Sequence, residues 1–216
     1  MADEPSKRSD WSEEDIAKLR SMIGGKRDIA DGAIPAVIFV VANAIWSLTV
    51  ASIASGAYGI GITLYRLIRR QDAKRALFGL VGLGIAIAIA LRTGSASAYF
   101  VPGVILGLLF GVLTLLTVVM KQPTSAMFAM ALEKKPAEYY KVPRVLRAHM
   151  LLTTIWAVVF IGRAALRAGL IVNDETALLG ASAIVLGYPV TIGLAGLSVL
   201  YLRRIAATVE VSENEA

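Results

Sequence analysis

The chain has 216 residues, of which 56% are hydrophobic, and its mean hydropathy is +0.67. This composition is too apolar for a water-soluble domain and predicts an integral membrane protein. The chain contains no cysteine and one histidine, which excludes disulfides, thiolate chemistry and metal sites built from clusters of these residues, so we expect no cofactor and no metal. In a membrane protein the net charge of +6 is typical of loops that face anionic headgroups, and we expect no nucleic-acid partner.

Residues 1–30 predict a polar tail that carries an amphipathic helix. Ser12 is a suitable N-cap, and three acidic residues follow it in the first turn, where the helix dipole favours anions. Four apolar residues then fall on one face, namely Ile16, Leu19, Met22 and Ile23. We expect this helix to lie on the inner membrane surface or against the rest of the protein.

Six apolar stretches follow, and each predicts a membrane-spanning helix. They cover residues 34–46, 48–67, 76–91, 99–120, 148–170 and 177–202. No charge separates the first two stretches, but a single helix over both would be ~50 Å long, too long for a bilayer core of ~30 Å. The chain must therefore turn near Trp46. We predict an all-α polytopic bundle of six transmembrane helices over residues 31–204.

The first span begins and ends with polar candidates. Asp31 could cap the helix ahead of Pro35, which the first turn tolerates, or it could titrate in a proton-coupled cycle. Asn43 and Ser47 lie four residues apart, so they share a helix face. They could line a ligand cavity or form hydrogen bonds between helices, and both readings stay open.

Glycines recur every fourth residue in the fourth span, at Gly103, Gly107 and Gly111. Small residues at this spacing allow two helix backbones to approach closely. The pattern predicts a packing face, either within the bundle or between the protomers of a homo-oligomer.

Basic residues gather at one set of helix ends. Nineteen of the 22 Lys and Arg residues precede the first span, follow the second, fourth or sixth span, or lie in the long loop of residues 121–147. The positive-inside rule then predicts three hairpins with both termini in the cytoplasm, so that residues 205–216 form a second cytoplasmic tail. We expect anionic lipid headgroups to contact this basic face.

Arg163 lies within the apolar run of residues 151–170, which contains no acidic residue. A charge at this depth costs a few kcal/mol or more, so it marks a functional site or a buried contact. Arg163 shares a helix face with Arg167, and together with Arg92 they could form an outward-facing site for a small anionic ligand, since a guanidinium engages two oxygens at once. The alternative is that both arginines reach the outer headgroups, with Asp174 and Glu175 as partners.

The sixth span contains a helix breaker in its middle. Pro189 follows Gly187 and Tyr188, and proline lacks the N–H that a continuous helix requires, so we expect a kink. Tyr188 and Thr191 could line a polar cavity beside the kink, or the kink could serve packing alone. Either role leaves the sixth helix as a candidate moving element.

The chain offers no catalytic set within its spans. A carboxylate pair, a Ser–His–Asp set and a metal cluster all require acids or histidines inside the bundle. We expect His149 to be an isolated residue at the membrane interface. The sequence therefore predicts that the protein is not an enzyme.

Several short motifs resemble those of a known family. Residues 24–39 read GGxRxxxDxxxPxxxF, and further matches fall at Thr93 and Gly94, Tyr99 and Phe100, Pro102 and Gly103, and Thr154, Trp156, Phe160 and Arg163. Together they resemble an actinobacterial family of membrane proteins with a domain of unknown function, which is distantly similar to intracellular septation protein A. The resemblance implies a six-helix protein of the bacterial plasma membrane without an established biochemical activity.

Two functions of different classes are consistent with these residues. The first is a small transporter or permease-like protein for an anionic or amphipathic solute. The second is a non-transporting scaffold or regulator of the cell envelope that binds lipids and protein partners. A polar cavity that reaches Arg163 would favour transport, whereas a solid apolar bundle with Arg163 turned to the outer headgroups would favour the scaffold.

Overall fold

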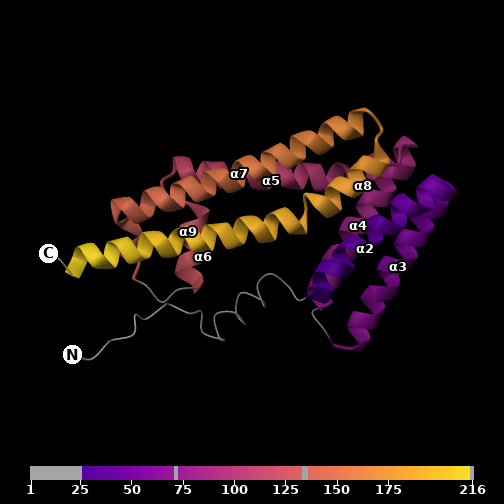
Figure 1. Ribbon diagram of the computed structural model, residues 1–216. Coiled ribbons are helices and arrows are strands. Elements are labelled where there is room, and N and C mark those ends of the chain that lie inside the picture. The colour runs from indigo at the N-terminus through magenta and orange to yellow at the C-terminus, as the bar shows by residue number, and fades with distance from the viewer. Residues whose placement is uncertain (1–25, 71–72, 133–135, 215–216) are drawn as a thin grey trace, which may run out of the picture.

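The structure is a computed structural model that describes residues 26–70, 73–132 and 136–214. Every regular element among these residues is a helix. The helices form two groups that meet near one end of the molecule and diverge from there, as Figure 1 shows. The predicted amphipathic helix of residues 12–23 lies outside the described residues.

The first group contains three consecutive helices, α2 (Lys26–Ile45), α3 (Leu48–Ile68) and α4 (Ala73–Thr93). α3 packs against α2 on one side and α4 on the other. α3 and α4 approach closely at Gly59, where an added Cβ would overlap the end of the Leu83 side chain and force it to move.

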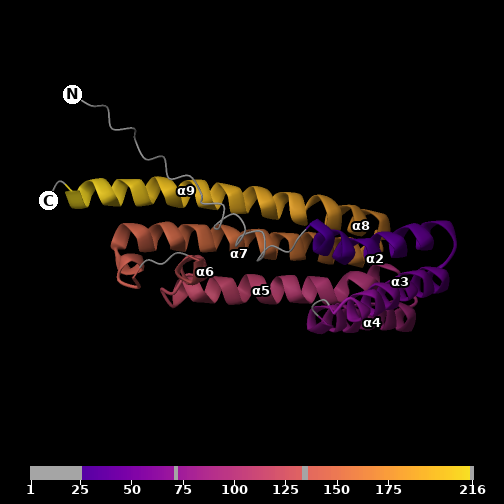
Figure 2. The same ribbon diagram turned by 90° about the horizontal axis from the view of Figure 1, so that it is seen from below.

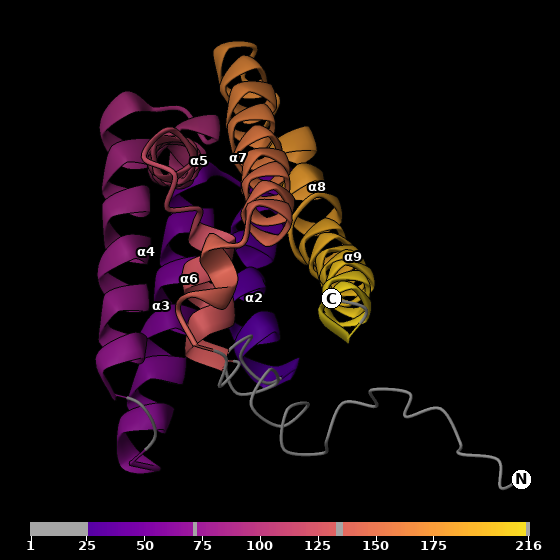
Figure 3. The same cartoon turned by 90° about the vertical axis from the view of Figure 1, so that its left-hand side faces the viewer.

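The second group contains the longest helices. The short helix η1 (Ser97–Phe100) leads into α5 (Val101–Val119), which lies beside α7 (Pro143–Val172), and α9 (Tyr188–Asn214) follows on the other side of α7 (Figure 2). The connection between α5 and α7 contains α6 (Thr124–Leu132) and η2 (Tyr139–Lys141). Figure 3 shows α6 below the ends of α5 and α7.

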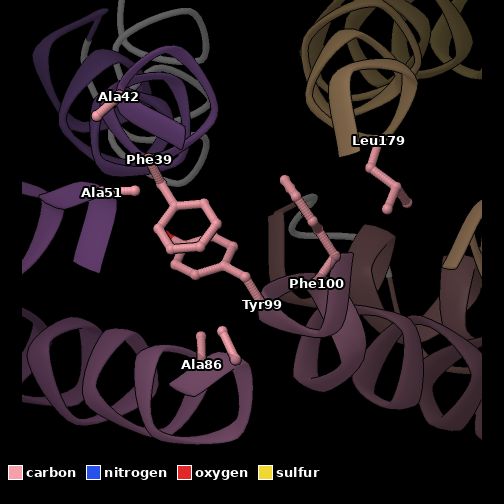
Figure 4. Close-up of a cluster of buried hydrophobic side chains, with 8 residues drawn as sticks. Phe39, Ala42, Ala51, Ala86, Tyr99, Phe100 and Leu179 are labelled. Atoms are coloured by element: carbon pink, nitrogen blue, oxygen red, sulfur yellow. The ribbon is translucent and has the colours of Figure 1, made fainter. Parts of the chain in front are cut away.

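One aromatic cluster joins the two groups. Phe39 of α2 stacks on Tyr99 of η1, with ring centroids 4.0 Å apart, and Phe100 lies edge-on to Tyr99. Leu179 enters the same cluster from α8 (Thr176–Val185) and is fully buried (Figure 4). The packing of α8 against α2 depends on Gly180, because an added Cβ would come within 2.8 Å of Val40.

The described part of the chain has five helices that are long and apolar enough to span a membrane. Large apolar side chains are exposed along nearly all of them, which is stable only in a nonpolar environment. The prediction of a helical membrane bundle is therefore confirmed, and the protein is membrane-embedded. The first predicted span, residues 34–46, corresponds to the apolar part of α2, Ala33–Ile45, which is shorter than a typical spanning helix. It is therefore not one of the five.

Two predicted boundaries also differ from the structure. α2 begins at Lys26, so Asp31 lies inside the helix instead of at its N-cap, and Pro35 lies inside it as well. The Ser55 hydroxyl of α3 donates to the Pro35 carbonyl (3.0 Å) and ties the two helices together there. At the other end of the chain, α9 continues as a helix to Asn214, beyond the predicted end of the sixth span at residue 202.

Candidate functional site

One face of α7 carries the polar side chains that meet the sixth apolar stretch. Trp156, Phe160, Arg163 and Arg167 follow one another at intervals of four, three and four residues, which places them on the same helix face. The rings of Trp156 and Phe160 lie 5.7 Å apart. This face is directed at α8 and α9, as the hydrogen bonds below show.

Three side chains of α7 donate hydrogen bonds across this contact. Arg167 Nε and Nη2 donate to Ser182 Oγ and to the Ser182 carbonyl, both at 3.3 Å. Arg163 Nη1 donates to Thr191 Oγ1 at 3.0 Å, and Trp156 Nε1 donates to Ser198 Oγ at 3.2 Å. We call these six residues the polar seam: Trp156, Arg163 and Arg167 on α7, and Ser182, Thr191 and Ser198 on α8 and α9.

The polar seam has a regular register. Trp156 and Arg163 are seven residues apart, and so are their partners Ser198 and Thr191 in the opposite order. Seven residues make about two helical turns, so an antiparallel pair of helices brings both bonds into line. The seam is therefore a repeated contact along one line of packing.

Donors and acceptors are divided strictly between the two sides of the seam. The Thr191 hydroxyl donates to the Gly187 carbonyl (2.7 Å), and the Ser198 hydroxyl donates to Leu194 in the same way (2.7 Å). The Ser182 hydroxyl donates to the Leu179 carbonyl at 2.8 Å. Since each hydroxyl proton is already used, these oxygens can only accept, whereas tryptophan and arginine side chains can only donate.

The two arginines bracket a break in the sixth apolar stretch. α8 ends at Val185 and α9 begins at Tyr188, and a side chain at Gly187 would collide with the Ala183 carbonyl oxygen. Arg167 contacts the last turn of α8, where the helix dipole favours a cation. Arg163 contacts the first turn of α9. The predicted kink is thus a full interruption with one arginine on each side.

Arg163 carries two donors that the fold does not use. Its Nε and Nη2 atoms are buried and have no hydrogen-bond partner among the described atoms. These two nitrogens form one edge of the planar guanidinium group, and their N–H bonds point the same way. The equivalent edge of Arg167 is the one that engages Ser182. Of these two edges, that of Arg163 is the one without a protein partner among the described atoms.

The remaining candidate residues are placed apart from the seam. Ser47 is the N-cap of α3, where its hydroxyl oxygen accepts from the Val50 amide (3.3 Å). Arg92 lies in the last turn of α4 and takes no part in the contacts of Arg163 and Arg167. Of the other predicted ligand residues, Thr191 joins the seam, while the side chains of Tyr188 and Asp31 lie outside the described part of the structure.

Asn43 lines an open hollow of about 470 Å³ at the end of the molecule where three short connections meet. We call this the short-loop end; it comprises residues 46–47, 94–96 and 173–175. Asp174 and Glu175 also line the hollow, but no seam residue does. Asp174 Oδ1 accepts a hydrogen bond from Ser95 (2.7 Å), and hydrogen bonds from Ser97 and Ser95 hold the pKa of this carboxyl below its usual range. The hollow is therefore acidic, and Asp174 bonds to serine instead of an arginine.

The glycine pattern of the fourth span packs partly against α7. An added Cβ at Gly111 would come within 2.6 Å of Ile161 Cγ1 and 3.2 Å of the Ile161 backbone nitrogen. At Gly107 it would touch Ala164 at an ordinary distance of 3.8 Å, and at Gly103 it would meet nothing within 4 Å. Gly111 therefore marks the tightest point between α5 and α7.

A second polar cluster was not expected from the sequence. Ser125 of α6 lies 3.0 Å from His149 Nδ1 and 2.9 Å from Thr153 Oγ1, and its hydroxyl also reaches the His149 carbonyl at 2.9 Å. His149 is buried and lies within hydrogen-bond distance of Ser125, so the prediction that it is isolated was wrong. The contacts fasten α6 to α7. Sequence spacing carries no signal for this pair, because Ser125 and His149 lie on different helices.

The comparisons with known proteins give one result. No curated protein and no solved structure matches the chain. A family model, described as a protein of unknown function (DUF3159), matches residues 23–209, a range that contains the whole polar seam and ends within α9. The chain belongs to the DUF3159 family.

Proposed function

We propose that the protein is a small transporter or permease-like protein for an anionic or amphipathic solute, with Arg163 as the group that binds the anion. The observation that supports this proposal is the pair of buried Arg163 donors without a partner. A buried donor left unpaired costs about 1–3 kcal/mol and more when charged, so a fold keeps such a pair only where something else satisfies it.

The helix break next to Arg163 supports the same proposal. Transporters commonly place their substrate site at interrupted helices, where the N-terminus of a half-helix attracts an anion. Arg163 contacts the first turn of α9, which is such an N-terminus. Arg167 positions the preceding half-helix by binding the end of α8. The break at Gly187 is the point about which α9 moves.

The proposal also includes the membrane topology, the oligomeric state and the absence of an enzymatic activity. Both termini face the cytoplasm of a bacterial plasma membrane, the six apolar helices cross as three hairpins, and the short-loop end faces outward. The open surface at Gly103 supports a contact between two copies of the chain, because no atom within 4 Å covers it. The protein is not an enzyme, and it works without a cofactor or a metal.

A second function, a non-transporting envelope scaffold that binds lipids and protein partners, is supported by α6. This short helix exposes Met127 and Phe128 by 53% and 60% of their surfaces, and it lies in the basic connection of residues 121–147. Apolar side chains beside lysines and arginines suit the interface of an anionic membrane.

Uptake by proteoliposomes tests the transport proposal. Purified protein is reconstituted, and the entry of radiolabelled carboxylates, phosphates and organic cations is followed with and without a pH gradient. We expect uptake of an anion class that Arg163→Ala abolishes and Arg92→Ala leaves unchanged. Uptake of none of these solutes, together with binding of anionic vesicles through α6, would instead establish the scaffold.

A further inference from the structure

Building on the proposed function, we infer that the ligand of Arg163 is an amphiphile with a carboxylate head. The carboxylate binds side-on to Arg163 Nε and Nη2, and the apolar tail lies against the lipid-facing surfaces of α7 and α9. Four observations lead to this inference: the shape of the unused edge, the free donors, the exposed surface beside it, and the character of the hollow.

The edge formed by Nε and Nη2 suits a planar ligand with two oxygens. Two parallel N–H bonds match the two oxygens of a carboxylate, and the resulting charge-assisted bonds are about twice as strong as neutral ones. Arg167 shows this geometry within the same seam, since its Nε and Nη2 atoms engage two oxygens of Ser182 at the same distance. A carboxylate at Arg163 would repeat the arrangement seen one turn away.

The free donors at the site favour a carboxylate. Arg167 is the other cation on this face, and its matching edge is already used. A phosphate monoester would bring further oxygens and a second negative charge, which need further donors at this depth. The two oxygens of a carboxylate match the two unpaired donors of Arg163.

The surfaces beside the seam are apolar and open to lipid. On α7, Leu166 follows Arg163 by three residues and is 48% exposed. From residue 189 to residue 208, α9 contains no buried residue. A ligand whose head sits in the seam therefore has apolar helix surface next to it along which a hydrocarbon tail can lie.

The hollow at the short-loop end does not serve an anion that arrives from water. It is lined by Asp174 and Glu175, and it includes no residue of the seam. An anion would be repelled there, whereas an amphiphile dissolved in the bilayer reaches α9 from the side. Since the Arg163 edge is buried, entry requires α9 to shift at Gly187, where the helix is already interrupted.

Quenching of Trp156 fluorescence tests this inference. Trp156 lies seven residues from Arg163, or about 10 Å along the helix, and Trp11→Phe and Trp46→Phe leave it as the one tryptophan. The protein in lipid nanodiscs is titrated with a bromine-labelled decanoate, whose tail quenches a nearby indole. We expect saturable quenching that Arg163→Lys weakens at least tenfold and Arg92→Lys does not change.

Competing probes separate the head from the tail. Unlabelled decanoate should displace the probe, whereas acetate, decanol and decyl phosphate should do so at least tenfold less well. Equal displacement by decyl phosphate would overturn the carboxylate assignment, and equal displacement by acetate or decanol would overturn the amphiphile. Ser198→Ala, which breaks the seam at Trp156 and leaves the contact of Arg163 with Thr191 intact, should keep binding, so loss in Arg163→Lys cannot be attributed to a disturbed seam.

The results also separate this inference from the transport proposal. Saturable, Arg163-dependent quenching without uptake by proteoliposomes would contradict transport and keep the carboxylate site. Uptake of anions together with quenching that is the same in the wild type and in Arg163→Lys would contradict the carboxylate site and support the transport proposal.

Discussion

Arg163 and Arg167 present the same guanidinium edge to different surroundings, and this difference is the basis of the proposed site. Arg167 donates hydrogen bonds from Nε and Nη2 to Ser182 and thereby holds the end of α8. Arg163 donates a hydrogen bond from Nη1 to Thr191, and its Nε and Nη2 atoms have no partner among the described residues. The proposal therefore gives the two residues separate roles: Arg167 positions a helix end, and Arg163 binds the ligand.

Removing the acceptor for Arg163 should destabilise the protein measurably. Thr191→Val keeps the shape of the side chain but leaves Arg163 Nη1 without its 3.0 Å partner. We expect a loss of about 1 kcal/mol in the free energy of unfolding, as for hydrogen bonds between membrane helices. Unfolding in mixed micelles measures it, with Thr191→Ser as the control that keeps the hydroxyl. Equal stability of all three proteins would show that this bond contributes nothing.

The short-loop end should lose stability in acid. Hydrogen bonds from Ser97 and Ser95 lower the pKa of Asp174, so the charged form is favoured by folding. This contribution is complete above the ordinary aspartate pKa of about 3.9, and it is lost as the pH falls through the lowered pKa of the folded protein.

Comparison of the wild type with Ser95→Ala across pH isolates the effect on Asp174. We expect the wild type to have the higher thermal midpoint at pH 7 and the difference to shrink as the pH falls below about 3.9. Because Asp174 is exposed, the difference should be small. A gap that widens in acid would show that Asp174 is not stabilised in its charged form.

At the scale of single elements, the sequence predicts where helices lie better than it predicts how they meet. The fifth predicted span, residues 148–170, lies within α7 (Pro143–Val172), and the kink at Gly187 and Pro189 coincides with the gap between α8 and α9. Hydropathy and proline placement are local signals, so both could be predicted. The apolar part of α2, Ala33–Ile45, agrees with the first predicted span of residues 34–46. The start of α2 at Lys26 was not predicted, because the hydropathy pattern does not mark a helix start in the polar residues before Ala33.

The sequence identifies several polar side chains of the site but not how they pair. Arg163, Arg167 and Thr191 stand out as polar residues in apolar runs. Their pairing with each other depends on the register between α7 and α9, which no local pattern fixes. Arg92 was grouped with them because it lies near the same predicted membrane surface, but its helix belongs to the other group. Ser182 and Ser198 were missed because serine is common in membrane helices.

The contact between α5 and α7 should depend on one glycine of the three. Gly111→Ala places a Cβ 2.6 Å from Ile161 Cγ1 and close to backbone, so the helices must separate. We expect it to cost about 1–3 kcal/mol of unfolding free energy. Gly103→Ala is the matched control, because its Cβ meets nothing within 4 Å and should leave the monomer unchanged. Equal losses for both variants would mean that the close approach lies elsewhere along α5.

At the scale of the molecule, the two helix groups share one aromatic joint and diverge beyond it. Phe39, Tyr99 and Leu179 bring α2, η1 and α8 together near the short-loop end. α8 belongs to this joint, whereas α9 runs along α7 in the second group. The break at Gly187 therefore lies at the boundary between the groups, where a shift of α9 need not disturb the aromatic joint.

The orientation in the membrane can be measured directly, because the chain has no cysteine of its own. Single cysteines are introduced at Asn173, at the short-loop end, and at Lys121, in the basic connection, and intact cells are treated with an impermeant thiol reagent. We expect Asn173→Cys to be labelled in intact cells and Lys121→Cys to be labelled only after the cells are permeabilised. The reverse pattern would invert the proposed topology.

The bound carboxylate itself provides the most direct test of the site. Solid-state NMR of protein with ¹⁵N-labelled arginine side chains and decanoate labelled with ¹³C at the carboxyl carbon measures the dipolar coupling between the two. We expect a coupling to one Nε and one Nη that disappears in Arg163→Lys and persists in Arg92→Lys. No coupling in the wild type at saturating decanoate, or a coupling that survives in Arg163→Lys, would contradict a carboxylate bound side-on by Arg163.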